Sequence, residues 1–123
     1  MKNMSCLFHS LSKFTKQSAE DVRGAVCDYL ERGGRIIDGL DTSDILKLEH
    51  EDYINNMRKS STWGGAIEIQ AACNVYAMRV FVVDMHTKRY IEFLPLDAKV
   101  STEAKLMWSG SHYEPVLTID NVL

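Results

Sequence analysis

The stretch RVFVVD, residues 79–84, decides the fold of this chain. Its β-branched and aromatic side chains are typical of a central strand. Residues 90–94 alternate apolar and polar side chains, which predicts a neighbouring strand after a turn at residues 85–88. A last strand is expected from Tyr113 to Thr118. The strands therefore gather in the later part of the sequence.

The chain before residue 79 has helical patterns instead. Residues 18–21 predict the capped start of a helix that stops at residues 33–34, and residues 43–59 predict two short helices with a break near residues 49–52. Residues 66–78 predict an alanine-rich helix, and a short helix is expected to begin at or just before Cys6. Helices first and strands last, without a repeat or linker, predict one α+β domain over residues 1–123, with a small sheet packed between helices.

Composition excludes several classes of protein. The 123 residues are 46% hydrophobic and 25% charged, which is typical of a folded globular chain. A net charge of -3, without a long basic cluster, gives no reason to expect binding to nucleic acid or to an anionic membrane. The apolar runs are too short to cross a bilayer. Three cysteines in a domain that needs no disulfide favour free thiols in a reducing, cytoplasmic compartment.

Three fragments far apart in the sequence predict a single active site: residues 3–8 (NMSCLF), residues 63–65 (WGG) and residues 112–114 (HYE). A thiol is a useful nucleophile only as thiolate, so a catalytic cysteine needs a nearby imidazole, a helix N-terminus or both. Cys6, at the start of its expected helix, and His112 can meet this need. The sequence therefore predicts a cysteine peptidase with Cys6 as nucleophile and His112 as base.

With these segments in place, the chain resembles the ovarian tumour (OTU) family of cysteine peptidases over nearly its whole length. The order of four motifs carries the resemblance. Residues 3–8 are similar to the family's nucleophile loop, usually DGNCLF, and residues 110–114 to its histidine motif. Between them, the central block and the central strand of the family are matched by Tyr53, Met57, Thr62-Trp63-Gly64-Gly65, Glu68 and residues 79–83.

The resemblance implies a papain-type fold and cleavage after the C-terminal glycine of ubiquitin. Backbone N–H groups of Met4, Ser5 and Cys6 would form the oxyanion hole. The substrate groove would be lined by Trp108, Gly110 and Tyr113, with core packing as the alternative for Trp108. No metal or organic cofactor is implied. The expected partners are ubiquitin, polyubiquitin or ubiquitin-like modifiers, bound by a monomer.

The chain departs from the family pattern at two places. It has Asn3 and Met4 where the family usually has Asp and Gly, and Glu114 where the family commonly has Asn or Asp. Pro115 favours an extended backbone at Glu114, so the Glu114 carboxylate can share a face with His112 and orient its ring. Asn3 is the competing orienter, and the sequence does not decide between the two.

Other residues have alternative interpretations. His9, three residues after Cys6, is a rival base, although solvent exposure or packing is favoured for it. Cys27 and Cys73 lie in predicted helices and are expected to be inert core thiols. No Cys-x-x-Cys or His-x-x-x-His pair predicts a metal site. Trp63 is expected to be a packing anchor beside a tight turn.

An acidic stretch over residues 41–52 is expected to be either a solvated helix surface or an attraction for basic surface on ubiquitin. Two further functions remain open: a ubiquitin-binding module that has lost its chemistry, and a thiol protease that processes a polyprotein. The small size and the changed loop also resemble viral members of the family. Because only five residues precede Cys6, the chain is expected to be a fragment, a trimmed form or a minimal member whose first residues order on ubiquitin binding.

Overall fold

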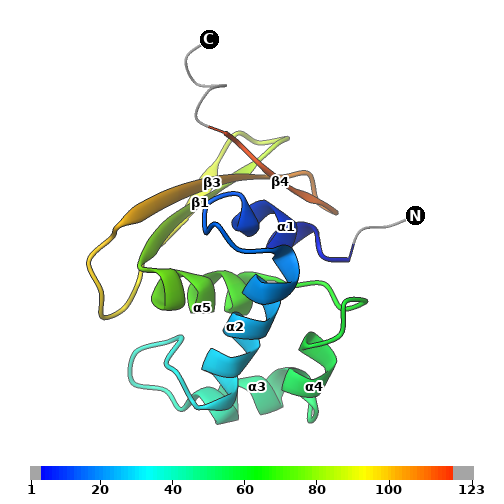
Figure 1. The fold of residues 1–123 in the computed structure, drawn as a ribbon, viewed down its shortest axis with the longest axis vertical. Coiled ribbons are helices and arrows are strands. Elements are labelled where there is room, and N and C mark those ends of the chain that lie inside the picture. The colour runs from blue at the N-terminus through cyan, green and yellow to red at the C-terminus, as the bar shows by residue number, and fades with distance from the viewer. Residues whose placement is uncertain (1–3, 118–123) are drawn as a thin grey trace.

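The computed structural model describes residues 4–117 and has five helices followed by four strands in that range (Figure 1). This order confirms the predicted α+β class. The elements are α1 (Cys6–Ser12), α2 (Ala19–Glu31), α3 (Thr42–Glu49), α4 (Tyr53–Met57), α5 (Ala66–Tyr76), β1 (Met78–Asp84), β2 (Tyr90–Phe93), β3 (Thr102–Trp108) and β4 (Tyr113–Pro115).

Side-chain caps fix the starts of three of the five described helices, α2, α3 and α5. Ser18 Oγ accepts the Asp21 N–H at 3.0 Å at the start of α2, as the sequence predicted. Asp41 Oδ1 accepts the Ser43 N–H at 2.8 Å before α3, and Glu68 Oε1 accepts the Gly65 N–H at 2.7 Å before α5. The predicted break between two short helices is confirmed, because α3 ends at residue 49 and α4 begins at residue 53.

The boundary between α5 and β1 differs from the prediction. Ala77 has a left-handed backbone, with φ of 52°, and this conformation ends the helix. Met78 already belongs to β1, so the helix predicted over residues 66–78 is two residues too long. Met78 is fully buried in the core and is the first residue of β1.

The four strands form one mixed sheet in the order β2-β1-β3-β4. β1 is an inner strand, as predicted, and pairs antiparallel with β2 and parallel with β3. The sequence analysis missed β3. β4 pairs antiparallel with β3 and ends at Pro115, earlier than the predicted end at Thr118, which lies outside the described residues. Pro115 has no N–H to donate, which weakens the ladder at that point.

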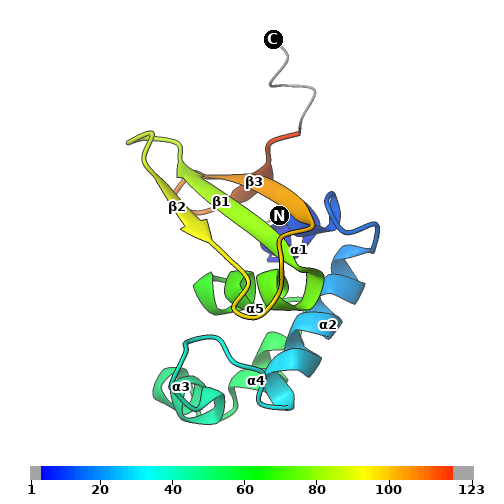
Figure 2. The same cartoon turned by 90° about the vertical axis from the view of Figure 1, so that its left-hand side faces the viewer.

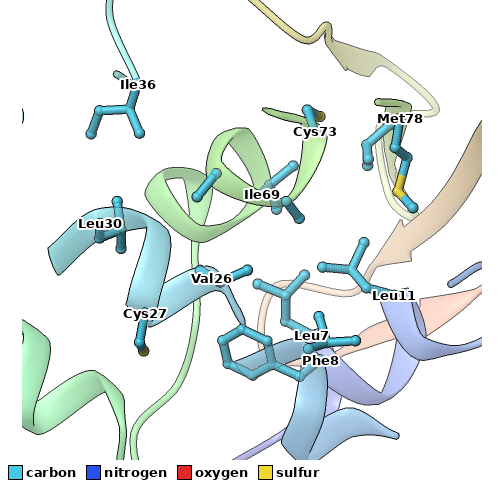
Figure 3. Packing of buried hydrophobic residues seen from close by; sticks show 14 of the residues in the cluster. Leu7, Phe8, Leu11, Val26, Cys27, Leu30, Ile36, Ile69, Cys73 and Met78 are labelled. Carbon is cyan, nitrogen blue, oxygen red and sulfur yellow. The ribbon is translucent and has the colours of Figure 1, made fainter. Parts of the chain in front are cut away.

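The helices gather on one side of the sheet (Figures 1 and 2), with α1 against β4 and α5 against β1, so the prediction of a sheet packed between helices is wrong. The core lies between these layers. Leu7, Phe8 and Leu11 of α1 are at most 1% exposed. In Figure 3, Leu7 and Phe8 point towards Val26 of α2. None of the helices in residues 4–117 is long and apolar enough to cross a membrane.

Replacing Gly64 by alanine is expected to destabilise the domain, because the turn before α5 touches α1. A Cβ at this position would lie 2.7 Å from Leu7 Cδ2 and 3.0 Å from Phe8 Cζ, and both side chains are buried. Overpacking of this kind costs about 1–3 kcal/mol of unfolding free energy. Urea denaturation followed by circular dichroism measures the change.

Gly24→Ala is the matched control for this prediction. Gly24 lies in α2, and a Cβ there would meet no atom within 4 Å. Alanine in a helix interior is more stable than glycine by about 0.5–1 kcal/mol, so this variant should gain stability. Equal stability of the two variants would contradict the close packing of Gly64 on α1.

Candidate active site

The fold brings Cys6 and His112 into one small pocket. Cys6 is the first residue of α1, and His112 directly precedes β4, which packs against α1 (Figure 1). The pocket has a volume of about 90 Å³. Its lining residues are Cys6, His9, Ser10, Lys13, His112, Tyr113, Glu114 and Pro115. The predicted nucleophile and base are therefore neighbours in space, although they come from opposite ends of the chain.

A backbone hydrogen bond ties β4 to the thiol. The Tyr113 N–H donates to Cys6 Sγ at 3.5 Å. This donor can stabilise negative charge on the sulfur without adding a titratable group. The turn between β3 and β4 makes this approach possible, because Gly110 has a φ of +102°, which a residue with a side chain rarely adopts. The Ser109 N–H closes the turn by donating to the His112 carbonyl at 3.1 Å.

His112 has a carboxylate beside it. Glu114 Oε1 lies 3.8 Å from His112 Nε2, within ion-pair distance when the ring is protonated. The two side chains are 42% and 63% exposed, so both remain in contact with water. Because the Glu114 carboxylate lies at Nε2, the other ring nitrogen, Nδ1, is available for a second hydrogen-bond partner. The partner of one ring nitrogen determines whether the other donates or accepts a proton.

The nucleophile loop is described from Met4 onward, and Asn3 lies outside the described residues. Ser5 occupies the N-cap position of α1, and its carbonyl accepts the first helical hydrogen bond, from the His9 N–H at 2.8 Å. Met4 and Ser5 are both partly buried. The expected oxyanion donors of residues 4–6 therefore lie in the turn that leads into α1 and at the first residue of that helix.

Two charged residues are buried in the core, Arg23 against the loop before Cys6 and Glu68 against the turn before α5, and the sequence analysis predicted neither contact. Arg23 of α2 is 4% exposed and donates from Nη2 to Ser5 Oγ at 3.0 Å. Glu68 of α5 is 1% exposed and accepts hydrogen bonds from the Tyr53 hydroxyl at 2.5 Å and from the Gly65 N–H. Burial raises the pKa of Glu68, and these two hydrogen bonds oppose that rise.

The sequence does contain a weak signal for both residues. Arg23 lies between the buried apolar residues Val22 and Val26 of one helix, and Glu68 directly precedes the buried Ile69. A charged residue inside an apolar stripe needs an internal partner when it is buried. Periodicity alone does not say whether such a residue points into the core or reaches solvent with its charged end.

A family model described as OTU-like cysteine protease matches residues 5–113. The chain belongs to the OTU-like cysteine protease family. The match includes Cys6 and His112 and all elements from α1 to β3. The resemblance seen in the ordered motifs is therefore confirmed as family membership.

Relatives of this OTU domain include named ubiquitin thioesterases. The chain is 39% identical to ubiquitin thioesterase OTU1 of Mus musculus over 72 residues, which are 58% of this chain and 21% of that protein. It is 28% identical to ubiquitin thioesterase OTU1 of Danio rerio over 118 residues, which are 91% of this chain and 38% of that protein. The chain thus spans well under half the length of these relatives.

Solved OTU structures share the fold. An OTU domain in complex with ubiquitin matches with a TM-score of 0.73 and 26% identity, covering 94% of this chain and 64% of that one. An OTU deubiquitinase from Wolbachia pipientis wMel matches with a TM-score of 0.67 and 19% identity, covering 95% and 84% of the two chains. The second match supports the fold alone.

The three residues expected to line the groove of this OTU domain have different surroundings. Tyr113 lines the pocket of Cys6, whereas Trp108 and Gly110 are not among the described residues that line it. The rings of Trp108 and Tyr113 pack together with centroids 4.5 Å apart. Trp108 therefore contacts the pocket through Tyr113. Trp63 is 40% exposed and lines a separate pocket of about 580 Å³, so its role as a packing anchor stays a prediction.

The remaining candidates are mostly structural. Cys27 and Cys73 are fully buried, which confirms their predicted place in the core, and their inertness stays a prediction. His9 is exposed but lines the Cys6 pocket, so it remains a rival base to His112.

In the acidic stretch, Asp41 caps α3, and α3 lies far from α1 and β4 (Figure 1). Residues 4–117 contain no group of three His, Cys, Asp or Glu side chains placed to hold a metal.

Iodoacetamide at neutral pH is expected to modify Cys6 alone. Burial raises the pKa of Cys27 to about 11 and that of Cys73 to about 12, so both thiols stay protonated at pH 7. Their thiolate fractions are then on the order of one in ten thousand or less. Peptide mapping by mass spectrometry measures the modification. Urea-unfolded protein is the control and should react at all three cysteines, whereas equal labelling in the folded state would contradict the prediction.

Proposed function

We propose that this OTU domain is a deubiquitinase that hydrolyses the peptide or isopeptide bond after the C-terminal glycine of ubiquitin. One observation carries the proposal: Cys6 and His112 line the same pocket, with a backbone N–H on the sulfur and a carboxylate beside the imidazole. The family membership and the ubiquitin thioesterases among the relatives support the choice of reaction and substrate.

In the first half of the reaction, the Cys6 thiolate attacks the glycine carbonyl carbon and forms a tetrahedral oxyanion. Backbone N–H groups of residues 4–6 stabilise this charge, and one such donor commonly contributes about 3–4 kcal/mol to the transition state. Protonated His112 then gives its proton to the leaving lysine amine as the C–N bond breaks. The products of this half are a thioester on Cys6 and the free amine.

In the second half, water attacks the thioester carbonyl while His112 accepts its proton. The C–S bond breaks, ubiquitin leaves with a free carboxylate, and the Cys6 thiolate and protonated His112 are regenerated. We propose Glu114 as the residue that orients His112, because its carboxylate lies 3.8 Å from Nε2. No step requires a metal or an organic cofactor.

A reducing compartment such as the cytoplasm suits this chemistry, because the nucleophile must remain a free thiol. All three cysteines are free in the structure, which supports that environment. A single copy of the domain contains every group that the mechanism uses, so the proposed catalyst is a monomer. Ubiquitin-like modifiers with the same C-terminal Gly-Gly are alternative substrates.

The decisive experiment incubates the domain with full-length ubiquitin that carries a thiol-reactive electrophile at its C-terminus, followed by intact mass measurement. Wild type is expected to gain one ubiquitin, Cys6→Ala to gain none, and His112→Ala to react far more slowly. His9→Ala should react normally if His112 is the base. His50→Ala is the control for the loss of a histidine, because His50 is the C-cap residue of α3 and does not line the pocket of Cys6.

The absence of an adduct on folded wild-type protein would contradict the proposed hydrolase. Binding of unmodified ubiquitin by that same protein would then favour a ubiquitin-binding module without chemistry. Loss of the adduct in His9→Ala together with its retention in His112→Ala would instead assign the base to His9.

Glu114→Gln is expected to lower kcat/KM for a fluorogenic ubiquitin substrate by about 10- to 100-fold, a fraction of what a positioned acid–base group contributes. The amide keeps the shape of the side chain but removes the charge beside His112. The loss should lie mainly in kcat, because the carboxylate is proposed to act on the imidazole. Steady-state kinetics of the release of the fluorophore measures both constants.

Glu103→Gln is the matched control, because Glu103 is an exposed carboxylate on β3 of the same sheet. It should retain wild-type kinetics. Asn3→Ala tests the competing orienter in parallel. Full activity of Glu114→Gln with a large loss in Asn3→Ala would assign the orienting role to Asn3, and full activity of both would leave Cys6 and His112 as a sufficient dyad.

A further inference from the structure

Arg23 is a buried cation that contacts the nucleophile loop from α2. Its Nη2 donates to Ser5 Oγ at 3.0 Å and to the Met4 carbonyl at 3.4 Å. Its Nη1 donates to the Met57 carbonyl at 2.7 Å, at the end of α4. One side chain thus joins the loop before Cys6 to two helices that are remote from it in sequence.

The guanidinium is fixed on several sides. It lies 4.3 Å from the centroid of the Phe8 ring, and Phe8 is itself fully buried in α1. The planar fork of an arginine holds two acceptors in a defined relative position, which a flexible ammonium does not. Because Nη2 binds the Met4–Ser5 segment and Nη1 binds the end of α4, Arg23 holds these two segments at a fixed distance from each other.

Ion pairing does not explain why this cation is buried. No carboxylate within residues 4–117 lies within salt-bridge distance of Arg23, although the buried Glu68 is near enough to attract it electrostatically. The acceptors in contact with Arg23 are two carbonyls, a hydroxyl and the Met57 sulfur. Burial lowers the pKa of Arg23, as expected for a cation removed from water. Burying such a cation costs folding free energy. A buried charged group of this kind can serve to specify one local backbone conformation.

The contact with the Met4 carbonyl determines the direction of the next N–H. A trans peptide is planar, so its C=O and N–H point in opposite directions. Because the Met4 carbonyl points towards Arg23, the Ser5 N–H points away from Arg23. Rotation of this peptide would turn the Ser5 N–H inward and remove one donor from the proposed oxyanion hole.

We propose that Arg23 is a positioning residue that fixes the Met4–Ser5 peptide with its N–H presented to the oxyanion formed on attack by Cys6. The inference rests on the proposed function, because an oxyanion forms only in acyl transfer to the thiol. Arg23 is not among the residues that line the pocket of Cys6, and it acts through the loop. Its hydrogen bonds from α2 restrain the backbone of the loop, a restraint that the loop residues would otherwise have to provide by themselves.

Two small reagents separate this role from general damage to the site. p-Nitrophenyl acetate acylates Cys6 through a tetrahedral oxyanion: the thiolate adds to the ester carbonyl, and p-nitrophenolate leaves with the electron pair of the broken C–O bond. Iodoacetamide alkylates the same thiolate by displacement of iodide at a saturated carbon and forms no oxyanion. The ratio of the two rates therefore reports on the oxyanion site alone, without any need for ubiquitin.

Arg23→Gln is expected to lower the acylation rate by about 10- to 100-fold, since loss of a whole oxyanion donor costs about 100- to 1,000-fold. The alkylation rate should stay within about twofold of wild type, because the thiol itself is not changed. With a fluorogenic ubiquitin substrate, the same variant should lose kcat while KM stays nearly constant. Arg23→Lys keeps the charge without the fork and should fall between Arg23→Gln and wild type.

Ser5→Ala carries the test if Arg23→Gln does not fold. It removes the 3.0 Å acceptor from the loop and leaves the core untouched, because Ser5 is only partly buried. Its acylation should fall by about three- to tenfold, as part of one donor's effect. Arg32→Gln is the matched control: Arg32 follows α2, lies over the Tyr29 ring at 5.3 Å, and should leave both rates unchanged.

The inference is overturned if Ser5→Ala and a folded Arg23→Gln both acylate at the wild-type rate, or if acylation and alkylation fall together. Wild-type protein that is alkylated but never acylated would also overturn it. Failure of the proposed function gives a different result: normal acylation and alkylation of wild type, with no hydrolysis of the ubiquitin substrate. In that case the ratio of acylation to alkylation still decides the role of Arg23.

Discussion

The helix α1 has only seven residues, too few to be stable by itself in water, so its existence depends on the burial of its apolar side. Leu7, Phe8 and Leu11 provide that side and pack between α2, α5 and the sheet. Cys6 is the first residue of this helix, so its sulfur has a fixed place only because the core fixes the helix. The position of the proposed nucleophile is therefore a consequence of hydrophobic packing.

Much of the fold could be predicted because its signals are local. Ser18 and the glycines at residues 33–34 mark both ends of α2 through caps and turns, which need no knowledge of distant contacts. The β-branched run of β1 is equally plain. Cys6 and His112 could be paired only through the order of motifs along the chain, since periodicity carries no information on which ends of a chain meet in space.

The features that were missed depend on tertiary context. β3 contains Glu103, Ala104 and Lys105, residues that are poor strand formers, and it is stabilised by pairing with β1 on one side and β4 on the other. Arg23 is a residue type that is almost never fully buried without partners, and those partners lie on the nucleophile loop and on α4. A pattern within one helix could not reveal either neighbour.

β4 pairs with β3 alone among the described strands and also packs against α1, which has a consequence for when the pocket of Cys6 and His112 forms during folding. Contacts between α1 and β4 close a loop that spans almost the whole described chain, and such contacts are among the slowest to form because the entropy lost on closure is large. A partly folded molecule with an intact helical layer would still lack His112 at the thiol. The pocket that holds Cys6 and His112 should therefore form only when β4 docks, and the proposed reaction with ubiquitin would have to wait for this late step.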